Sequence, residues 1–305
     1  MSDHPRSEFR AHLESTRAQL EAKNAEIEKR AGRNLFFAVL SGLAFAGVFI
    51  ASLFFLKELF VALVAVLVSI ALVELAAAFR VAGRRVPRVG VVLGGLTIVT
   101  GAYVWGPEGM LLGLFAGSLL LTVWRLVEGL VPRWEVPKRT LIRDIFSGLF
   151  TLVYVSFLGS FAVLLLMADR GEWWVFSLVL VVVSVDIGAY AAGVTLGRHK
   201  MTPRISPNKT WEGFFGAATV AIIAGIAVSL LALDQPWWVG AVIGAVVLLT
   251  ATGGDLTESL IKRNLGVKDM SSWIPGHGGF LDRLDSLLPS AVGVYGVALS
   301  LGVVA

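Results

Sequence analysis

Residues 59–73 read Leu59-Phe-Val-Ala-Leu-Val-Ala-Val-Leu-Val-Ser-Ile-Ala-Leu-Val73, which is an apolar run broken only by one serine. A helix needs about 20 such residues to cross a hydrocarbon core of about 30 Å, and this run extends to Phe79 with one charge, Glu74. Closed β-barrels also cross bilayers, but their strands alternate apolar and polar residues. Because this run does not alternate, it predicts a membrane-spanning helix.

The composition of the whole chain agrees with this. Of 305 residues, 56% are hydrophobic and 16% are charged, whereas soluble domains have about 45–50% apolar and about 25% charged residues. Soluble two-domain and disordered classes are therefore excluded. The absence of cysteine excludes disulfides, thiolate metal sites and a cysteine nucleophile. A polar segment with charges of both signs precedes the first apolar run, so we expect that run to stay as an anchor rather than be cleaved.

The same criterion, applied along the chain, predicts an all-α polytopic membrane protein with about nine spans. The predicted spans are residues 35–56, 59–79, 89–105, 110–128, 145–168, 174–196, 211–233, 237–254 and 286–305.

Lysine and arginine fix the predicted orientation. The N-terminal tail and every second link hold 23 of the 26 cations, the other links hold only Lys57 and Arg170, and Arg125 lies inside the fourth span. Cation-rich links lie in the cytoplasm. We therefore expect a cytoplasmic N-terminus, an external C-terminus and a cell-membrane protein whose chemistry lies on the cytoplasmic side, where the longer links are.

Three regions follow from these spans. Residues 1–34 form a cytosolic tail, residues 35–140 an N-terminal region of four spans, and residues 141–305 a catalytic region of five spans with cytosolic loops 198–210 and 255–285. Within the tail, residues 7–30 carry apolar residues at seven-residue spacing, which predicts a solvated helix near the membrane, with dimerisation as the alternative.

Four charged residues within the predicted spans are candidates for function, since charge is costly in a bilayer. Small residues flank Asp186, so another helix or a ligand can approach it, and this favours a functional role for its carboxylate. Glu74 either lines a cavity or pairs with a basic neighbour. Arg125 and Glu128, at i and i+3, are interpreted as an intrahelical ion pair.

The loop from Arg198 to Gly213 alternates cations with hydroxyl and amide side chains and contains two prolines. Lys209 directly precedes an expected helix start, where free backbone N–H groups favour anions. A phosphate-binding loop fits, although a basic loop that only fixes topology fits almost as well.

The segment 253–285 is the richest in chemistry. If the helix continues past Asp255, then Asp255, Ser259 and Lys262 lie on one face, and Asp282 and Asp285 share another. Carboxylates converging from separate elements suit a hard cation such as Mg²⁺. His277 stands among glycines, where backbone can approach a ligand closely, and this favours function.

Carboxylates with a set of lysines and arginines predict phosphoryl or nucleotidyl transfer, in which two cations clamp an in-line displacement and basic side chains neutralise the phosphates. The sequence contains neither a Gly-x4-Gly-Lys-Ser/Thr loop nor His-Glu-x-x-His. P-loop hydrolysis and zinc proteolysis are therefore disfavoured.

These residues resemble a known signature. The runs Ser259-Leu-Ile-Lys-Arg263, Lys268-Asp269 and Ile274-Pro-Gly-His-Gly-Gly-Phe-Leu-Asp-Arg-Leu-Asp285 are similar to the signature of the phosphatidate cytidylyltransferases (CDP-diacylglycerol synthases) over 27 positions without a departure. Ser206-Pro-Asn-Lys-Thr-Trp-Glu-Gly213 and the stretch 186–193 also resemble that family, although Ile187 stands where the family commonly has a hydroxyl residue. The resemblance covers about the last 125 residues.

The resemblance implies Mg²⁺-dependent reaction of CTP with phosphatidate to give CDP-diacylglycerol and pyrophosphate, with the lipid bilayer as partner and no nucleic acid. Two cations are expected, the identity of the second being open, and a homodimer is one state described for the family. The expected metal ligands are Asp255, Asp282 and Asp285, with Asp186 as a weaker fourth. The expected catalytic and substrate-binding residues are Lys262, Arg263, His277, Ser206, Lys209, Arg204, Ser259 and Lys268.

Three other functions compete with this one. A cytidylyltransferase for an unusual lipid phosphate and a CTP-dependent polyprenol kinase are the rival enzymes, and the undeviating signature favours diacyl phosphatidate over both. A transporter is the rival from another class, but the sequence shows no convincing repeat, and most acidic residues gather at one face rather than at mid-depth.

Overall fold

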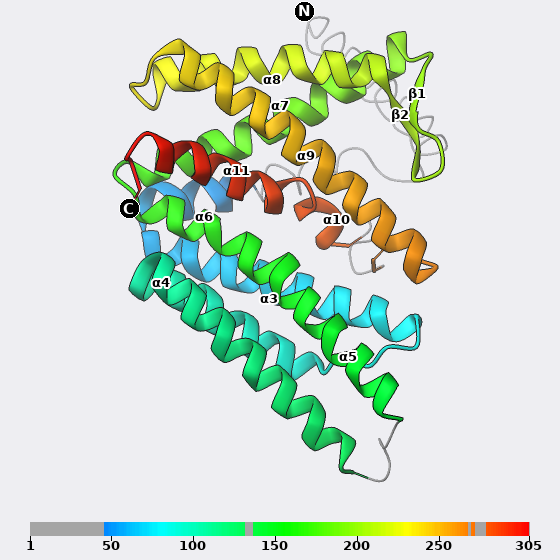
Figure 1. Ribbon diagram of the computed structural model, residues 1–305. Coiled ribbons are helices and arrows are strands. Elements are labelled where there is room, and N and C mark those ends of the chain that lie inside the picture. The colour runs from blue at the N-terminus through cyan, green and yellow to red at the C-terminus, as the bar shows by residue number, and fades with distance from the viewer. Residues whose placement is uncertain (1–45, 132–136, 268–269, 272–278, 305) are drawn as a thin grey trace, which may run out of the picture. The chain divides into compact units, whose positions relative to one another are not determined.

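The computed structural model describes residues 46–131, 137–267, 270–271 and 279–304 (Figure 1). Residues 1–52 and 53–305 form two compact units, and the second holds every helix from α3 onward. The predicted tail helix lies outside the described residues. The described part of the first predicted span is the short apolar helix Ala46–Phe55.

The second unit is built of helices. Their bounds are α3 Lys57–Val81, α4 Arg88–Gly129, α5 Lys138–Thr151, the π-helical η2 Leu152–Phe157, α6 Leu158–Met167, α7 Gly171–Leu196, α8 Trp211–Leu231, α9 Trp237–Leu265, α10 Leu281–Leu284 and α11 Leu287–Ser300. Within the described residues, α3, α4, the continuous run from α5 to α6, α7, α8 and α9 are each long and apolar enough to cross a membrane. A helical, multi-pass membrane architecture is thus confirmed, while the count of nine spans stays a prediction.

Helix α4 contains the third and fourth predicted spans, folded back on each other. The backbone leaves the helical region at Gly106 (φ 63°, ψ −146°), a conformation that favours glycine. A Cβ added at Gly101 would lie 2.1 Å from the Gly109 carbonyl oxygen, and one added at Gly117 would lie 2.4 Å from that of Gly94. Glycine at these positions therefore lets the two arms approach backbone to backbone.

The charges of α4 pair with other elements, so the predicted intrahelical pair of Arg125 and Glu128 is wrong. Arg125, fully buried, donates to Asp144 Oδ2 of α5 at 2.8 Å, while Glu128 accepts from Arg85 Nε at 3.1 Å. The backbone N–H of Arg85 also donates to Asp144 at 3.0 Å. A buried guanidinium needs a carboxylate with good geometry, and Asp144 of the neighbouring helix supplies it.

The predicted loop 198–210 forms a hairpin, which the all-α prediction did not include. Strand β1 (Lys200–Thr202) pairs antiparallel with β2 (Ser206–Thr210), and α8 follows directly. Thr210 caps α8, since its Oγ1 accepts from the Gly213 N–H at 3.1 Å. The hairpin therefore places Ser206 and Lys209 next to a helix start.

Helix α9 runs on to Leu265, eleven residues past the predicted end of its span. Asp255, Ser259 and Lys262 therefore do share one helix face, and Ser259 Oγ donates to Asp255 Oδ1 at 3.4 Å. After the described part of the following link, the short α10 leads into α11, which packs against α6 and α9.

Candidate active site

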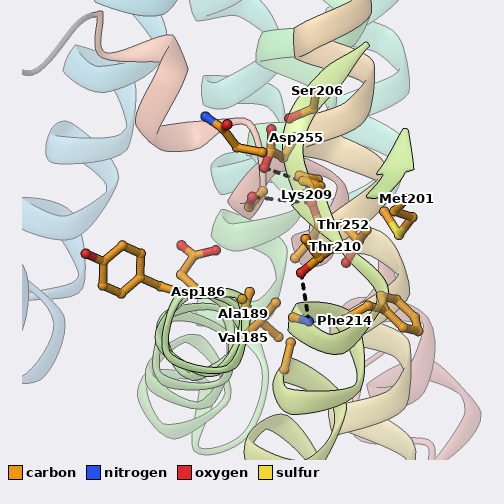
Figure 2. A pocket seen from close by; sticks show the side chains of 17 residues that line it. Val185, Asp186, Ala189, Met201, Ser206, Lys209, Thr210, Phe214, Thr252 and Asp255 are labelled. Atoms are coloured by element: carbon orange, nitrogen blue, oxygen red, sulfur yellow. Dashed lines mark hydrogen bonds and ion pairs between the residues drawn. The ribbon is translucent and has the colours of Figure 1, made fainter. Parts of the chain in front are cut away.

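A pocket of about 320 Å³ opens between α7, the β-hairpin, α8 and α9 (Figure 2). Four residues singled out from the sequence line it: Asp186, Ser206, Lys209 and Asp255. These four residues lie up to 69 positions apart in the sequence, and the fold brings them into one pocket. Beside this pocket α7 and α8 pack closely, since a Cβ on Gly188 would lie 2.9 Å from the α8 backbone.

The Lys209 ammonium and the Asp255 carboxylate form the central contact of the pocket. Lys209 Nζ lies 2.7 Å from Asp255 Oδ2, and Figure 2 shows the pair spanning from β2 to α9. Asp186 extends from α7 into the same space. The pocket thus offers an ammonium group and two carboxylates to a ligand, together with the hydroxyl of Ser206.

Asp285 extends the acidic group beyond the pocket lining. Burial raises its pKa to about 7, and the charge of the nearby Asp255 carboxylate adds to the rise, with Asp186 contributing in the same direction. A cation placed among these three carboxylates would reverse this effect by favouring their charged forms. Asp285 is therefore linked electrostatically to the two carboxylates of the pocket.

Asp282 has a different environment. Its Oδ1 accepts from Lys262 Nζ at 2.9 Å and its Oδ2 from the Gly279 N–H at 2.7 Å. Burial alone would raise the pKa of Asp282, but the neighbouring Glu258 carboxyl, the Gly279 amide and the Lys262 ammonium together hold it below its usual value. Lys262 also contacts Glu258 Oε2 at 2.7 Å, so it bridges two acidic groups. Glu258 was not among the predicted site residues, although its i, i+4 spacing to Lys262 indicated the contact.

Glu74 supports the segment that carries Asp282 and Asp285, a role that neither sequence interpretation of this residue foresaw. It lies on α3, 1% exposed, and its carboxylate accepts from the backbone N–H groups of Phe280 at 3.0 Å and Leu281 at 2.8 Å. Ser271 Oγ donates to it at 2.5 Å. A buried carboxylate at the N-terminus of a helix is stabilised by such donors. Glu74 therefore anchors α10 from another part of the chain.

The remaining predicted residues have varied surroundings. Arg263 Nε approaches the Ile205 carbonyl oxygen at 3.5 Å, which joins α9 to the hairpin turn. Arg204 lies exposed in that turn. His277 and Lys268 lie outside the described residues, so their roles stay predictions.

The oxygen donors fit Mg²⁺ in kind. Within the described ranges, no three Asp, Glu or His side chains are placed as a ready-made metal-binding group. Asp186 and Asp255 nevertheless line one pocket, Asp285 lies within electrostatic reach of both, and carboxylates are the ligands that Mg²⁺ prefers. These three carboxylates thus match Mg²⁺ in chemical kind, without forming a complete cation site in the described residues.

Known proteins are similar to this chain over most of its length. The profile described as "Cytidylyltransferase family" matches residues 37–301. The phosphatidate cytidylyltransferase of Mycobacterium bovis is 38% identical over 87% of this chain and 89% of its own length. The one from Mycobacterium leprae is 39% identical over 86% and 87%, and the one from Brucella suis 37% identical over 61% and 68%.

The family match spans both the hairpin and α9, and thus contains the Lys209–Asp255 pocket and the Asp282–Lys262 contact. The resemblance seen over the last 125 residues therefore extends through almost the whole chain. The chain belongs to the cytidylyltransferase family.

Proposed function

We propose that this chain is a phosphatidate cytidylyltransferase, which joins CTP and phosphatidate to give CDP-diacylglycerol and pyrophosphate. The observation that carries the proposal is the pocket lined by Lys209, Asp255 and Asp186, in which Lys209 contacts Asp255. Paired cationic and acidic groups suit a triphosphate, and relatives that are 38–39% identical to this chain are named for this reaction.

The reaction needs positioning and charge neutralisation more than proton transfer. An oxygen of the phosphatidate phosphate attacks the α-phosphorus of CTP, a new P–O bond forms, and the bond to the β-phosphate breaks as pyrophosphate leaves. Since the attacking phosphate is already an anion at neutral pH, no strong base is required. Lys209, Lys262 and Arg263 are the residues that neutralise and orient the phosphates.

Asp186, Asp255 and Asp285 would hold Mg²⁺, which when bound neutralises phosphate charge and aligns the in-line displacement. Asp282 would take a direct role by exchanging Lys262 for the cation, since Lys262 contacts its Oδ1 and the Gly279 N–H its Oδ2. Lys262, once released from Asp282, would be available to a phosphate group.

We place the pocket on the cytoplasmic side of the cell membrane, since it lies in a region whose links are rich in lysine and arginine. Nine spans with a cytoplasmic N-terminus then put the C-terminus outside. A reporter enzyme active only outside the cytoplasm, fused after Ala305, is expected to be active, and the same reporter fused after Arg198 is expected to be inactive. The opposite pattern would show that the orientation or the count is wrong.

Pyrophosphate release from the purified full-length protein tests the activity. With CTP, Mg²⁺ and phosphatidate in mixed micelles, we expect pyrophosphate in step with CDP-diacylglycerol, and neither product when CTP or phosphatidate is omitted. Replacing CTP by ATP is expected to remove most of the activity. Release that does not need phosphatidate would indicate nucleotide hydrolysis and overturn the proposal.

A further inference from the structure

A second hollow, of about 400 Å³, lies apart from the pocket described above and shares none of its lining residues. Two arginines and three phenylalanines make most of its wall: Arg84, Arg143, Phe79, Phe146 and Phe150. We call it the Arg84–Arg143 groove. It lies between the end of α3, the α5 helix and the last turns of α9, where Ile261 and Leu265 complete it.

The charge of the groove is positive. Arg143 donates to the Gly83 carbonyl oxygen at 2.8 Å, and Arg84 Nη1 lies 3.4 Å from Ser147 Oγ and its guanidinium 5.6 Å from the Phe79 ring centre. These are neutral partners. Among the residues that the structure describes, no carboxylate lies within ion-pair distance of Arg84 or Arg143. Both guanidinium groups therefore have charge to offer to an anion.

The walls of the groove are apolar and partly exposed. Phe146 is 67% exposed and Phe150 39% exposed, on a helix that continues through η2 and α6 as a candidate membrane span. Cationic groups beside apolar surface at the end of a spanning helix match the boundary between lipid head groups and acyl chains. A soluble nucleotide has no acyl chains to cover this apolar wall, whereas a lipid anion does.

The groove also adjoins the acidic site. Phe150 stacks on Tyr154 of η2, with ring centres 5.5 Å apart and planes at 9°. Tyr154 is buried, its hydroxyl has no hydrogen-bond partner among the described residues, and Asp285, Glu258 and Asp255 are the charges that act on it. On α9, Ile261 of the groove directly precedes Lys262 of the acidic site. The groove and the acidic site thus share helix α9, and Phe150 of the groove contacts the tyrosine on which the acidic charges act.

We propose that the Arg84–Arg143 groove binds the phosphate monoester head group of a membrane lipid, phosphatidate, as it approaches the acidic site from the cytosolic leaflet. This inference rests on the proposed function and adds to it the place where the lipid substrate binds. Two guanidinium groups suit a phosphate monoester better than a diester, because the monoester carries more charge and more terminal oxygens for paired hydrogen bonds.

The kinetic test is the double variant Arg84→Gln/Arg143→Gln in the full-length protein. We expect its KM for phosphatidate, expressed as mole fraction in mixed micelles, to rise at least about tenfold, since two charge-assisted hydrogen bonds are lost. The KM for CTP is expected to change less than about twofold. Arg84→Lys/Arg143→Lys, which keeps the charge but loses the paired geometry, is expected to give an intermediate KM.

The matched control is Arg88→Gln/Arg139→Gln, which removes the same charge from the starts of α4 and α5 at exposed positions outside the groove. It is expected to leave both KM values within about twofold. Equal changes in the control and groove variants, parallel changes in both KM values, or an unchanged KM for phosphatidate would each overturn the assignment.

Binding without turnover separates this inference from the proposed function. Isothermal titration without CTP is expected to show dihexanoyl phosphatidate binding more tightly than dihexanoyl phosphatidylglycerol or inorganic phosphate, and the groove variant is expected to lose that preference. Equal binding of all three would mean a general anion surface and contradict the proposal. If the wild-type protein binds phosphatidate but makes no CDP-lipid, and the groove variant does not bind phosphatidate, then only the proposed function is contradicted.

Discussion

Replacing Asp255 by asparagine is expected to lower kcat/KM for CDP-diacylglycerol formation by about a thousandfold. Asp255 lines the pocket, contacts Lys209 at 2.7 Å and lies within electrostatic reach of Asp186 and Asp285. Asparagine keeps the size of the side chain but removes a charge that would hold a cation and orient the lysine. Loss of a cation contact at a developing phosphate charge costs several kcal/mol, and about 4 kcal/mol is a thousandfold in rate.

The matched control for Asp255 is Asp234→Asn. Asp234 is 72% exposed and pairs with Arg170 away from the pocket, and exposed ion pairs contribute little. We expect the control to keep its activity within about twofold. Initial rates at several Mg²⁺ concentrations, with circular dichroism to verify folding, measure both variants. An Asp255→Asn protein that is folded and keeps more than a tenth of the activity would contradict the role given to this carboxylate.

Replacing Glu74 by glutamine is expected to lower kcat by about ten- to a hundredfold. The amide has only one oxygen acceptor, so the N–H groups of Phe280 and Leu281 cannot both keep their charged partner, and each such hydrogen bond is worth about 1.5–3 kcal/mol. Because Glu74 fixes the start of α10, its loss lets Asp282 and Asp285 shift. A backbone displacement of this kind lowers the rate more than it weakens CTP binding.

Glu58→Gln provides the comparison for Glu74, since Glu58 lies in the first turn of the same helix and is exposed. The control is expected to behave as wild type in rate and thermal unfolding. For Glu74→Gln, kcat should fall while the KM for CTP stays within about threefold. A KM effect alone, or an unchanged kcat, would show that Glu74 does not position the acidic segment.

The sequence predicted the parts of this protein that depend on local pattern. Continuous apolar runs indicated the spans, and the i, i+4 and i+7 spacing on α9 placed Asp255, Ser259 and Lys262 on one face, as the structure confirms. The return of α4 at Gly106 was also anticipated as two spans joined by a short link. Each of these rests on interactions between residues near one another in the chain.

The contacts between distant elements could not be predicted in the same way. Glu74 accepts a hydrogen bond from the N–H of Leu281, 207 residues further along the chain, and Arg125 pairs with Asp144 of α5 rather than with Glu128 of its own helix. The partner of a buried charge depends on how the helices pack, because packing determines which oppositely charged side chain lies beside it. The β-hairpin was missed for another reason, since its strands of three and five residues carry no alternating apolar pattern.

The fate of the CTP phosphates tests the central claim most directly. Purified protein is incubated with Mg²⁺, phosphatidate and CTP labelled either at the α- or at the γ-phosphate, and the lipid is then extracted. Cytidylyl transfer predicts that the α-label enters the lipid as CDP-diacylglycerol while the γ-label stays in the water phase as pyrophosphate. If instead the γ-label enters the lipid and the α-label stays in water, the protein is a CTP-dependent lipid kinase and the account is contradicted.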